Sequence, residues 1–428
     1  MSGSIGVVGG GQLALMLAEA AQRLGVELHI QTPLATDPAA ALATSVVQAP
    51  VDDLAGTRSL AALCQAISFE NEWLNLDALA ALEAEGVVFV PRLQALQPLV
   101  SKRSQRELLD RLQLASPRWI PLEAVLAPPA GLAADLRPQP AGGPGGEGWQ
   151  LATAEGGTAE APNPHEPGVP RLPEGFSFPL MAKAATGGYD GRGTACIHND
   201  QELALLVERV PPEQWLLEEF VAFEQELALV ACRDRGGNVR AFPLVQTHQH
   251  NRVCDWVLAP ANVSHAVEAR ARNMAASLLT ALDYAGVLSV EFFYGPAGLQ
   301  VNELAPRTHN SGHYTIEATV TSQFEQQVRI VQGLGLGDTA LKLPGALMVN
   351  LLGFETAASS YEEQRQALAD LPGASVHWYG KRESSPGRKL GHVTLQLGQE
   401  QPEPRQQEAM QRLDQVRAIW PLPPEERP

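Results

Sequence analysis

Two glutamates stand on either side of a predicted β-turn. Glu291 lies in an apolar and aromatic run before Gly-Pro-Ala-Gly at 295–298, and Glu303 lies in the run that follows. Proline suits the second position of a type I turn, and Gly298 suits the left-handed residue that closes a three-residue loop. A loop of residues 296–298 pairs the two glutamates directly on one face of the hairpin, whereas a slip of one residue separates them.

Facing carboxylates repel each other unless a cation lies between them. Mg²⁺ takes one or two carboxylates and completes its octahedron with phosphate oxygens and water. The pair therefore predicts a magnesium–nucleotide site with Glu291 and Glu303 as the metal ligands. The alternative is a solvated edge hairpin that carries two unrelated acids.

Polar residues crowd the chain directly after Glu303. A cation, two imidazoles, an amide and a hydroxyl beside a candidate metal indicate an anion-handling loop, formed by Arg307, His309, Asn310, Ser311, Gly312 and His313. A plain polar turn would explain the serine and the glycine. It would not explain an arginine next to two histidines.

Composition sets the broad class. The 428 residues predict two to three domains, and 45% hydrophobic residues are ample for a core. The net charge of −17 argues against nucleic acid or an anionic membrane as the main partner. Four cysteines lack metal-finger spacing, and neither a leader nor an 18-residue apolar run is evident. We expect a cytoplasmic protein.

The chain opens with a strand–helix–strand pattern, which predicts a parallel, Rossmann-like sheet. Its turn reads Gly9-x-Gly11-x-x-Ala14, close to the dinucleotide-binding fingerprint. The second strand ends in Gln31 instead of the acid that would bind a ribose, which weakens the NAD interpretation. Glu70, at a later strand end, is either a site residue or a helix cap.

Three further segments suit a nucleotide or a phosphate. A glycine-rich loop at 187–193 follows a strand that carries Lys183, and it lacks the Gly-Lys-Ser/Thr of a Walker A loop. A strand at 215–221 runs into a linker of the kind that holds adenine. Lys381, Arg388 and Lys389 form a basic cluster that suits a phosphate monoester. The alternative for the glycine-rich loop is a flexible hairpin loop, and the alternative for the basic cluster is a charged turn.

Two segments are predicted to lack a packed core. Residues 127–175 contain 20 glycines and prolines among 49 residues, which predicts a surface insertion. The end of the chain is rich in Pro, Gln and Glu, and we expect a loosely ordered tail. The predicted units are 1–98, 99–335 with the insertion, 336–398 and the tail at 399–428.

Together these segments resemble the ATP-grasp superfamily and, within it, the 5-(carboxyamino)imidazole ribonucleotide synthase family. The resemblance covers about 4–397 without the insertion, and it rests on 9–13, 187–193, 302–325 and 386–392. It implies an α/β (α+β) fold. An ATP-grasp domain would lie between an N-terminal Rossmann-like (pre-ATP-grasp) domain and a small C-terminal β-rich domain.

The resemblance also implies a chemistry: bicarbonate and MgATP give carboxyphosphate, and the amine of aminoimidazole ribonucleotide takes the carboxyl group. It implies catalytic roles for Arg307, His309, Asn310 and Asp190. The ribonucleotide would be held by Gln12, Tyr189, Arg192, Lys381, Arg388 and Lys389. ATP would be held by Lys102, Lys183, Gly188, Tyr189, Asp190, Gly191, Arg192, Gly193, Thr194, Glu218, Glu219, Phe220, Val221, Glu226, Asn302 and Glu303.

The resemblance further implies Mg²⁺ as cofactor, bicarbonate as co-substrate, a homodimer, and transfer of the product to a downstream mutase. Gln249 departs from the histidine common in relatives. The alternatives are another ATP-grasp ligase, such as a formate-dependent glycinamide ribonucleotide transformylase or a biotin carboxylase, and a nucleotide-binding regulator without turnover. The loop from Arg307 to His313 argues against the other ligases.

Overall fold

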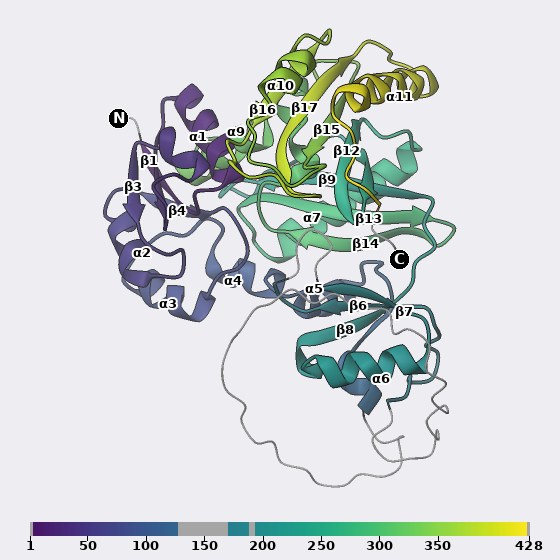
Figure 1. Ribbon diagram of the computed structural model, residues 1–428. Coiled ribbons are helices and arrows are strands. Elements are labelled where there is room, and N and C mark those ends of the chain that lie inside the picture. The colour runs from purple at the N-terminus through teal and green to yellow at the C-terminus, as the bar shows by residue number, and fades with distance from the viewer. Residues whose placement is uncertain (1–2, 127–169, 188–192, 426–428) are drawn as a thin grey trace.

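The computed structural model describes residues 3–126, 170–187 and 193–425, which form three β-sheets with helices packed around them. The N-terminal sheet lies to one side of a large central sheet, and a third, smaller sheet lies below it (Figure 1). Most of the predicted insertion, 127–169, and most of the glycine-rich loop, 188–192, lie outside the described residues. No helix in the described part is both long and apolar enough to cross a membrane.

The N-terminal sheet is parallel, as predicted, with the strand order β3-β2-β1-β4. Its inner strand β1 is almost fully buried, with Ile5 and Val7 each 1% exposed. Its elements are β1 (Ser4–Val8), α1 (Gln12–Leu24), β2 (Glu27–Thr32), β3 (Ser45–Gln48), α2 (Leu54–Ala61), β4 (Ala66–Phe69), α3 (Leu76–Ala84) and α4 (Leu93–Leu96).

The glycine motif at the start of α1 receives a carboxylate from the protein itself. Glu70, just after β4, accepts hydrogen bonds from the backbone N–H groups of Gly11 at 2.7 Å and Leu13 at 3.1 Å. A Cβ at Gly9 or Gly11 would lie 2.5 Å from the Glu70 side chain. The glycines therefore allow Glu70 to cap α1, and no room is left there for a pyrophosphate.

The central sheet has nine strands in the order β14-β13-β9-β11-β12-β15-β17-β16, with β10 beside β9. Strands from the predicted C-terminal unit, β15 to β17, extend the sheet through the β12–β15 pair. Its strands are β9 (Gln225–Arg233), β10 (Val239–Ala241), β11 (Val245–His250), β12 (Val253–Ala259), β13 (Gly286–Gly295), β14 (Gly298–Ala305), β15 (Gly345–Leu352), β16 (Ala374–Trp378) and β17 (Lys389–Leu397).

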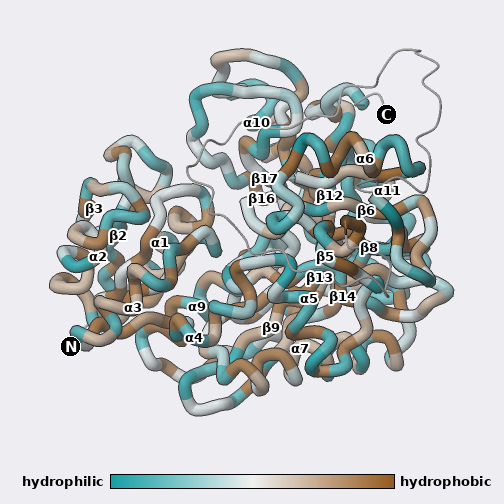
Figure 2. The backbone as a smooth tube through the Cα atoms, turned by 90° about the horizontal axis from the view of Figure 1, so that it is seen from below, coloured by the Kyte–Doolittle hydropathy of each residue, from teal (hydrophilic) through white to brown (hydrophobic). Residues whose placement is uncertain are grey.

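Two long helices pack on the central sheet, and a short one precedes the second of them. α7 (His265–Ala281) packs against β9 and β13, and hydrophobic and polar positions alternate along it in Figure 2. α9 (Gln323–Gln332) follows α8 (Thr315–Ala318) and packs against both β13 and α1. Phe324 and Val328 of α9 share one buried cluster with Ile5 and Val287. α9 therefore fixes the N-terminal sheet against the central sheet.

The predicted pairing of Glu291 with Glu303 is confirmed, although the turn differs by one residue. Gly295 pairs with Gly298, so the loop has two residues, and the register then shifts between Glu291 and Phe292. This bulge leaves Asn302 as the extra residue and restores the Glu291–Glu303 pair. Without it, Glu291 would pair with Asn302 and the two acids would lie on opposite faces.

The small sheet has the order β5-β8-β6-β7 and lies beneath the β13–β14 hairpin (Figure 1). Leu180, Ala182 and Leu217 form its buried side, each 0% exposed. Its elements are α5 (Lys102–Arg111), β5 (Trp119–Pro121), β6 (Leu180–Ala184), β7 (Thr194–Ile197), α6 (Asp200–Arg209) and β8 (Trp215–Glu219).

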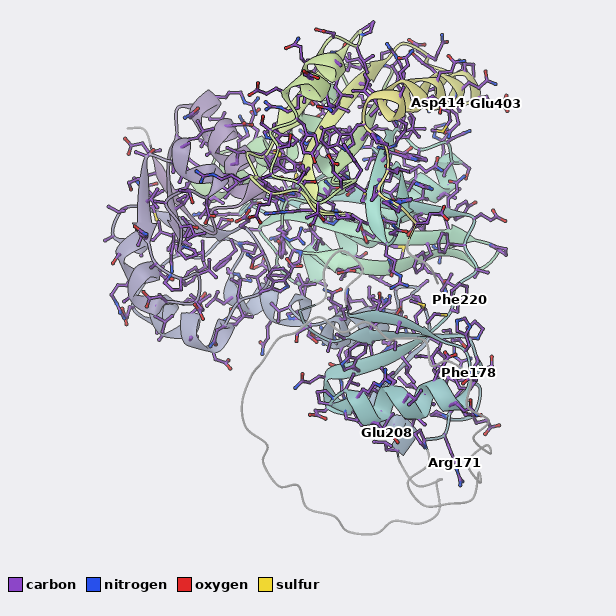
Figure 3. All side chains as sticks on the ribbon, in the orientation of Figure 1. Arg171, Phe178, Glu208, Phe220, Glu403 and Asp414 are labelled. Atoms are coloured by element: carbon purple, nitrogen blue, oxygen red, sulfur yellow. The ribbon has the colours of Figure 1, made fainter. Side chains whose placement is uncertain are left out.

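The prediction of a loosely ordered tail after residue 398 is wrong. α11 (Pro402–Ile419) packs against β15 and β17, and the Trp420 indole donates to the Leu352 carbonyl at 2.7 Å. Only a few side chains of α11 are buried, and acids such as Glu403 and Asp414 point outward (Figure 3). The polar composition thus reflects a wide solvent face on a helix that is anchored by Ala409 and Val416 and, just after its end, by Trp420. The short α10 (Glu362–Ala369) packs beside it.

Candidate active site

The carboxylate pair lies where the hairpin faces the start of α5. The Lys102 ammonium is 2.7 Å from Glu303 Oε1, and the side chains of Glu291 and Glu303 are 24% and 38% exposed. Burial, with repulsion from Glu303 and Glu226, raises the pKa of Glu291 to about 7. Burial acts in the same direction on Glu303, but Lys102 outweighs it and holds the pKa of Glu303 below its ordinary value.

This arrangement fits a cation that also binds phosphate. In the described part of the chain, no three His, Cys, Asp or Glu side chains cluster into a protein-only metal site. Two facing carboxylates, of which Glu303 raises the pKa of Glu291, are an incomplete ligand set with excess negative charge, and Mg²⁺ would complete its coordination with phosphate oxygens. The pair and its exposed surface therefore suit a magnesium–nucleotide complex better than a closed metal site.

Glu226, on β9 beside the pair, offers a test by pH. Burial raises its pKa to about 7, and His248 partly opposes this. The folded-state pKa of Glu226 lies above its ordinary value of 4.5, so ionising this residue destabilises the fold. The loss of stability increases as the pH rises from 4.5 to 7. We expect Glu226→Gln to raise Tm at pH 8.5 and to change it little at pH 5, measured by differential scanning calorimetry. Glu224→Gln, at an exposed position two residues earlier, is the control; equal shifts at both pH values would contradict this assignment.

A buried ion cluster fixes the second lysine. Lys183 Nζ lies 2.7 Å from Glu218 Oε2 and 3.1 Å from Asn302 Oδ1, the residue added by the bulge. Arg106 of α5 binds the other oxygen of Glu218 at 2.7 Å and also donates to the Asn302 carbonyl at 2.6 Å. Burial would raise the pKa of Glu218, but Lys183 and Arg106 lower it to about 2. Glu218 is thus an ionised anchor for Lys183, although the sequence suggested a nucleotide contact.

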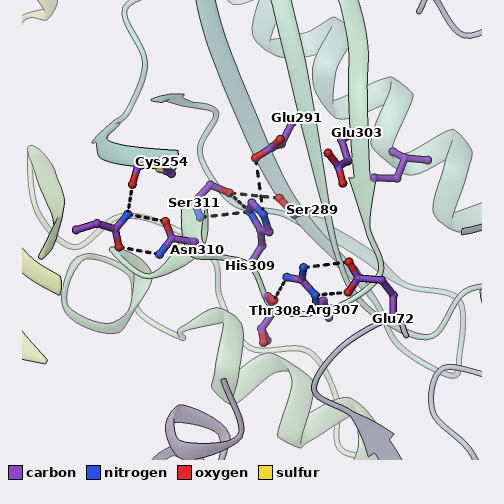
Figure 4. Close-up of polar contacts among 12 residues, drawn as sticks. Glu72, Cys254, Ser289, Glu291, Glu303, Arg307, Thr308, His309, Asn310 and Ser311 are labelled. Atoms are coloured by element: carbon purple, nitrogen blue, oxygen red, sulfur yellow. Dashed lines mark hydrogen bonds and ion pairs between the residues drawn. The ribbon is translucent and has the colours of Figure 1, made fainter. Parts of the chain in front are cut away.

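The loop at 307–313 lies against the carboxylate pair (Figure 4). Arg307 is held by both oxygens of Glu72, at 2.5 and 3.1 Å, and His309 Nε2 lies 3.7 Å from Glu291 Oε1. Burial and the Arg307 charge hold the pKa of His309 well below its ordinary value, so the imidazole is neutral. The loop therefore presents one cation and one neutral imidazole beside two carboxylates.

Asn310 is not free to turn. Its amide and that of Asn350 on β15 exchange hydrogen bonds of 2.9 and 2.6 Å, and Asn350 also donates to the Cys254 carbonyl at 2.9 Å. Asn350 is 0% exposed. The Asn310 side chain thus anchors the loop to the central sheet.

Residues predicted to hold the ribonucleotide come together from opposite ends of the chain. Lys381 Nζ donates to Gln12 Oε1 at 3.1 Å and to the Lys389 carbonyl at 2.6 Å, while Arg388 binds the Glu383 carbonyl at 2.8 Å. Gln12 begins α1 at the carboxyl edge of the parallel sheet, where ligands of such sheets bind.

The residues predicted to hold adenosine lie at the end of β8 and beyond it. Glu219 pairs with Arg118 at 3.2 Å, and the Phe220 side chain is 51% exposed. Gly193 has a φ of +75°, and Thr194 pairs with Lys183 between β7 and β6. Val221 follows in the linker. Outside the described residues lie Gly188, Tyr189, Asp190, Gly191 and Arg192.

Sequence reasoning missed several residues that the fold brings to this region. Glu72 lies two positions beyond Glu70 after β4, a strand-end position that could have signalled it. Arg106 faces the small sheet from α5, and its spacing from Lys102, one helical turn, was the available signal. Asn350 gave no signal, because it lies within a strand that reads as apolar.

Family models match three parts of the chain in succession. They describe a ribonucleotide synthetase preATP-grasp domain at 2–99, an ATP-grasp domain at 160–324 and a phosphoribosylaminoimidazole carboxylase C-terminal domain at 346–407. An N5-carboxyaminoimidazole ribonucleotide synthase from Synechococcus elongatus is 46% identical over 419 residues, 98% of this chain and 96% of the relative. The chain belongs to the N5-carboxyaminoimidazole ribonucleotide synthase family. The predicted ATP-grasp fold and ligase class are confirmed.

Solved structures of the N5-carboxyaminoimidazole ribonucleotide synthase family share the whole architecture. The enzyme from Thermotoga maritima superposes with a TM-score of 0.74 at 29% identity, covering 96% of this chain and 98% of that one. The enzyme from Aspergillus clavatus, in complex with ADP and 5-aminoimidazole ribonucleotide, superposes with a TM-score of 0.78 at 25% identity. The match covers 97% of this chain and 99% of that one.

Proposed function

We propose that this chain catalyses the ATP-dependent carboxylation of 5-aminoimidazole ribonucleotide by bicarbonate in purine biosynthesis. The products are 5-(carboxyamino)imidazole ribonucleotide, ADP and phosphate. The observation that carries the proposal is the Glu291–Glu303 pair flanked by Lys102 and by the loop at 307–313. Full-length identity of 46% to a synthase of that name supports the substrate assignment.

In the first step, a bicarbonate oxygen attacks the γ-phosphorus of ATP and the bond to the β-phosphate oxygen breaks, giving carboxyphosphate and ADP. Glu291 and Glu303 would hold Mg²⁺, and the cation would supply neutralisation of the phosphate charge. Lys102 and Lys183 contribute positive charge from α5 and β6. The hydrogen bond from Lys183 to Asn302 links this lysine to the strand that carries Glu303.

In the second step, the exocyclic amine attacks the carboxyl carbon of carboxyphosphate and its bond to the phosphate oxygen breaks, or the amine attacks CO₂ that this cleavage has already released. The amine gives up one proton, which the released phosphate can accept. Arg307 stabilises the anionic carboxyl group, and the neutral His309 orients it. Asn310 contributes by holding the loop, since its amide is engaged by Asn350. Carboxyphosphate hydrolyses readily, so the site must exclude water while it exists.

Gln12 and Lys381 form the centre of the ribonucleotide site, with Arg388 and Lys389 nearby. Their convergence at the carboxyl edge of the N-terminal sheet supports this placement, since a cluster of cations suits a phosphate monoester.

The test is an omission assay. ADP release is measured with ATP, bicarbonate and aminoimidazole ribonucleotide, and then with each left out in turn. We expect full ADP formation only with all three, and product formation in equal amount. ADP release with formate and glycinamide ribonucleotide instead would indicate the transformylase, and none with any acceptor would indicate a regulator.

We also infer a homodimer that works in the cytoplasm and passes its product to a downstream mutase. The support is the family resemblance alone. Light scattering after size-exclusion chromatography tests the dimer, and a monomer at micromolar concentration would contradict it.

A further inference from the structure

Gln323, the first residue of α9, contacts both sides of the His309 backbone. Its Oε1 accepts from the His309 N–H at 2.9 Å, and its Nε2 donates to the His309 carbonyl at 2.7 Å. Nε2 also lies 3.3 Å from His313 Nδ1. The Gln323 side chain is 0% exposed, so these bonds have no competition from solvent.

The surrounding chain is shaped to this amide. A Cβ at Gly312 would lie 2.6 Å from Gln323 Oε1 and 2.9 Å from its Nε2, so a larger residue at 312 would displace this amide. The Gln323 backbone is fixed in turn, because its N–H donates to Thr315 Oγ1 at 3.0 Å and that hydroxyl donates to the Gly312 carbonyl at 2.6 Å. The amide therefore has one position.

We propose that Gln323 is a positioning residue that sets the place of the His309 imidazole beside Glu291, and thereby governs bicarbonate use. Hydrogen bonds to both peptide groups that flank the His309 Cα fix its backbone, and the imidazole then moves mainly by rotation of its own side chain. Its Nδ1 is then held 2.9 Å from Ser311 Oγ and its Nε2 3.7 Å from Glu291. This inference rests on the proposed function for its kinetic test.

The same helix supplies a matched control. Gln326 is also 0% exposed and also clamps one backbone unit, accepting from the Gly337 N–H at 3.0 Å and donating to its carbonyl at 2.8 Å. Gly337 follows α9 in the chain, and its two bonds to Gln326 involve no residue of the loop at 307–313. Gln323→Leu and Gln326→Leu thus each remove one pair of bonds to the backbone of a single residue, at similar burial. Only Gln323→Leu affects the loop at 307–313, where it also removes the contact with His313.

The experiment compares the two variants with the wild-type protein. We expect kcat/KM for bicarbonate to fall about 10- to 100-fold in Gln323→Leu, since small displacements of positioned groups have effects of this size. The KM for ATP should stay within about twofold of wild type, and more ADP should form per carboxylated product. Gln326→Leu should lower Tm similarly and keep both the bicarbonate kinetics and the coupling.

Amide hydrogen exchange, read by mass spectrometry, tests the clamp without turnover. Exchange should accelerate over residues 307–313 in Gln323→Leu and over 333–339 in Gln326→Leu. If Gln323→Leu does not fold, Gly312→Ala displaces the same amide and should give the same kinetics. Equal kinetic changes in the two glutamine variants, or unchanged exchange over 307–313, would overturn the proposal. If the wild-type protein shows no bicarbonate-dependent ADP release, the proposed function is overturned instead.

Discussion

Glu303→Gln should lower kcat by about 10³-fold or more, because metal-ion charge stabilisation contributes several kcal/mol and each 1.36 kcal/mol is tenfold in rate. Lys102 keeps the Glu303 carboxylate ionised, and Glu303 pairs with Glu291 on the same face of the hairpin. The amide keeps the shape and removes the charge. Steady-state ADP release at saturating substrates, repeated across magnesium concentrations, measures the effect; half-saturation in magnesium should also rise.

The fold should survive this substitution. Glu303 is partly exposed, and the amide oxygen of a glutamine at this position can still accept a hydrogen bond from Lys102. The far-UV circular dichroism and Tm should therefore match the wild type within a few degrees. Glu268→Gln, in a surface pair with Arg272, is a control that should keep full activity. Wild-type turnover in Glu303→Gln would remove the metal role from the pair.

The carboxylate pair was predictable because turn chemistry and strand alternation constrain a hairpin strongly. The turn itself was predicted one residue too long, and a bulge at Asn302 cancelled the error. The alternation of apolar and polar residues along a strand does not show a bulge directly. Here two consecutive polar residues, Asn302 and Glu303, interrupt the alternation, and this interruption indicated the bulge. The parallel sheet was predictable for a similar reason, since its pattern is local.

What escaped prediction depends on contacts between distant segments. Gln323 is 14 residues from His309 and reads as an ordinary helix-start residue, and Glu72 is 235 residues from Arg307. The same holds for the C-terminal helix, where Trp420 packs edge-on against Phe354 and Tyr361. Polar composition hid that helix because most of its surface faces water.

Glu218→Gln should destabilise the fold by about 3–5 kcal/mol, the usual consequence of removing one partner from a buried ion cluster. Arg106 and Glu218 have side chains 3% and 2% exposed, and Lys183 is 10% exposed. The substitution leaves two cations buried around a neutral amide. Lys183 can respond by losing its proton, since burial already lowers its pKa, but the Arg106 guanidinium cannot. Urea titration at pH 7.5 measures the loss.

Glu219→Gln is the matched control, because the adjacent residue makes a surface pair with Arg118. It should change the free energy of unfolding by less than about 1 kcal/mol.

The stabilisation that Glu218 provides depends on pH, and the direction of this dependence follows from its pKa. Glu218 has a folded-state pKa of about 2 against an ordinary 4.5, so its contribution is present above pH 4.5 and is lost as the pH falls toward 2. The difference between wild type and Glu218→Gln should therefore shrink below pH 4.5. A difference that stayed constant across that range would show that the loss comes from packing, and the ion cluster would then not be what holds Lys183 beside the hairpin.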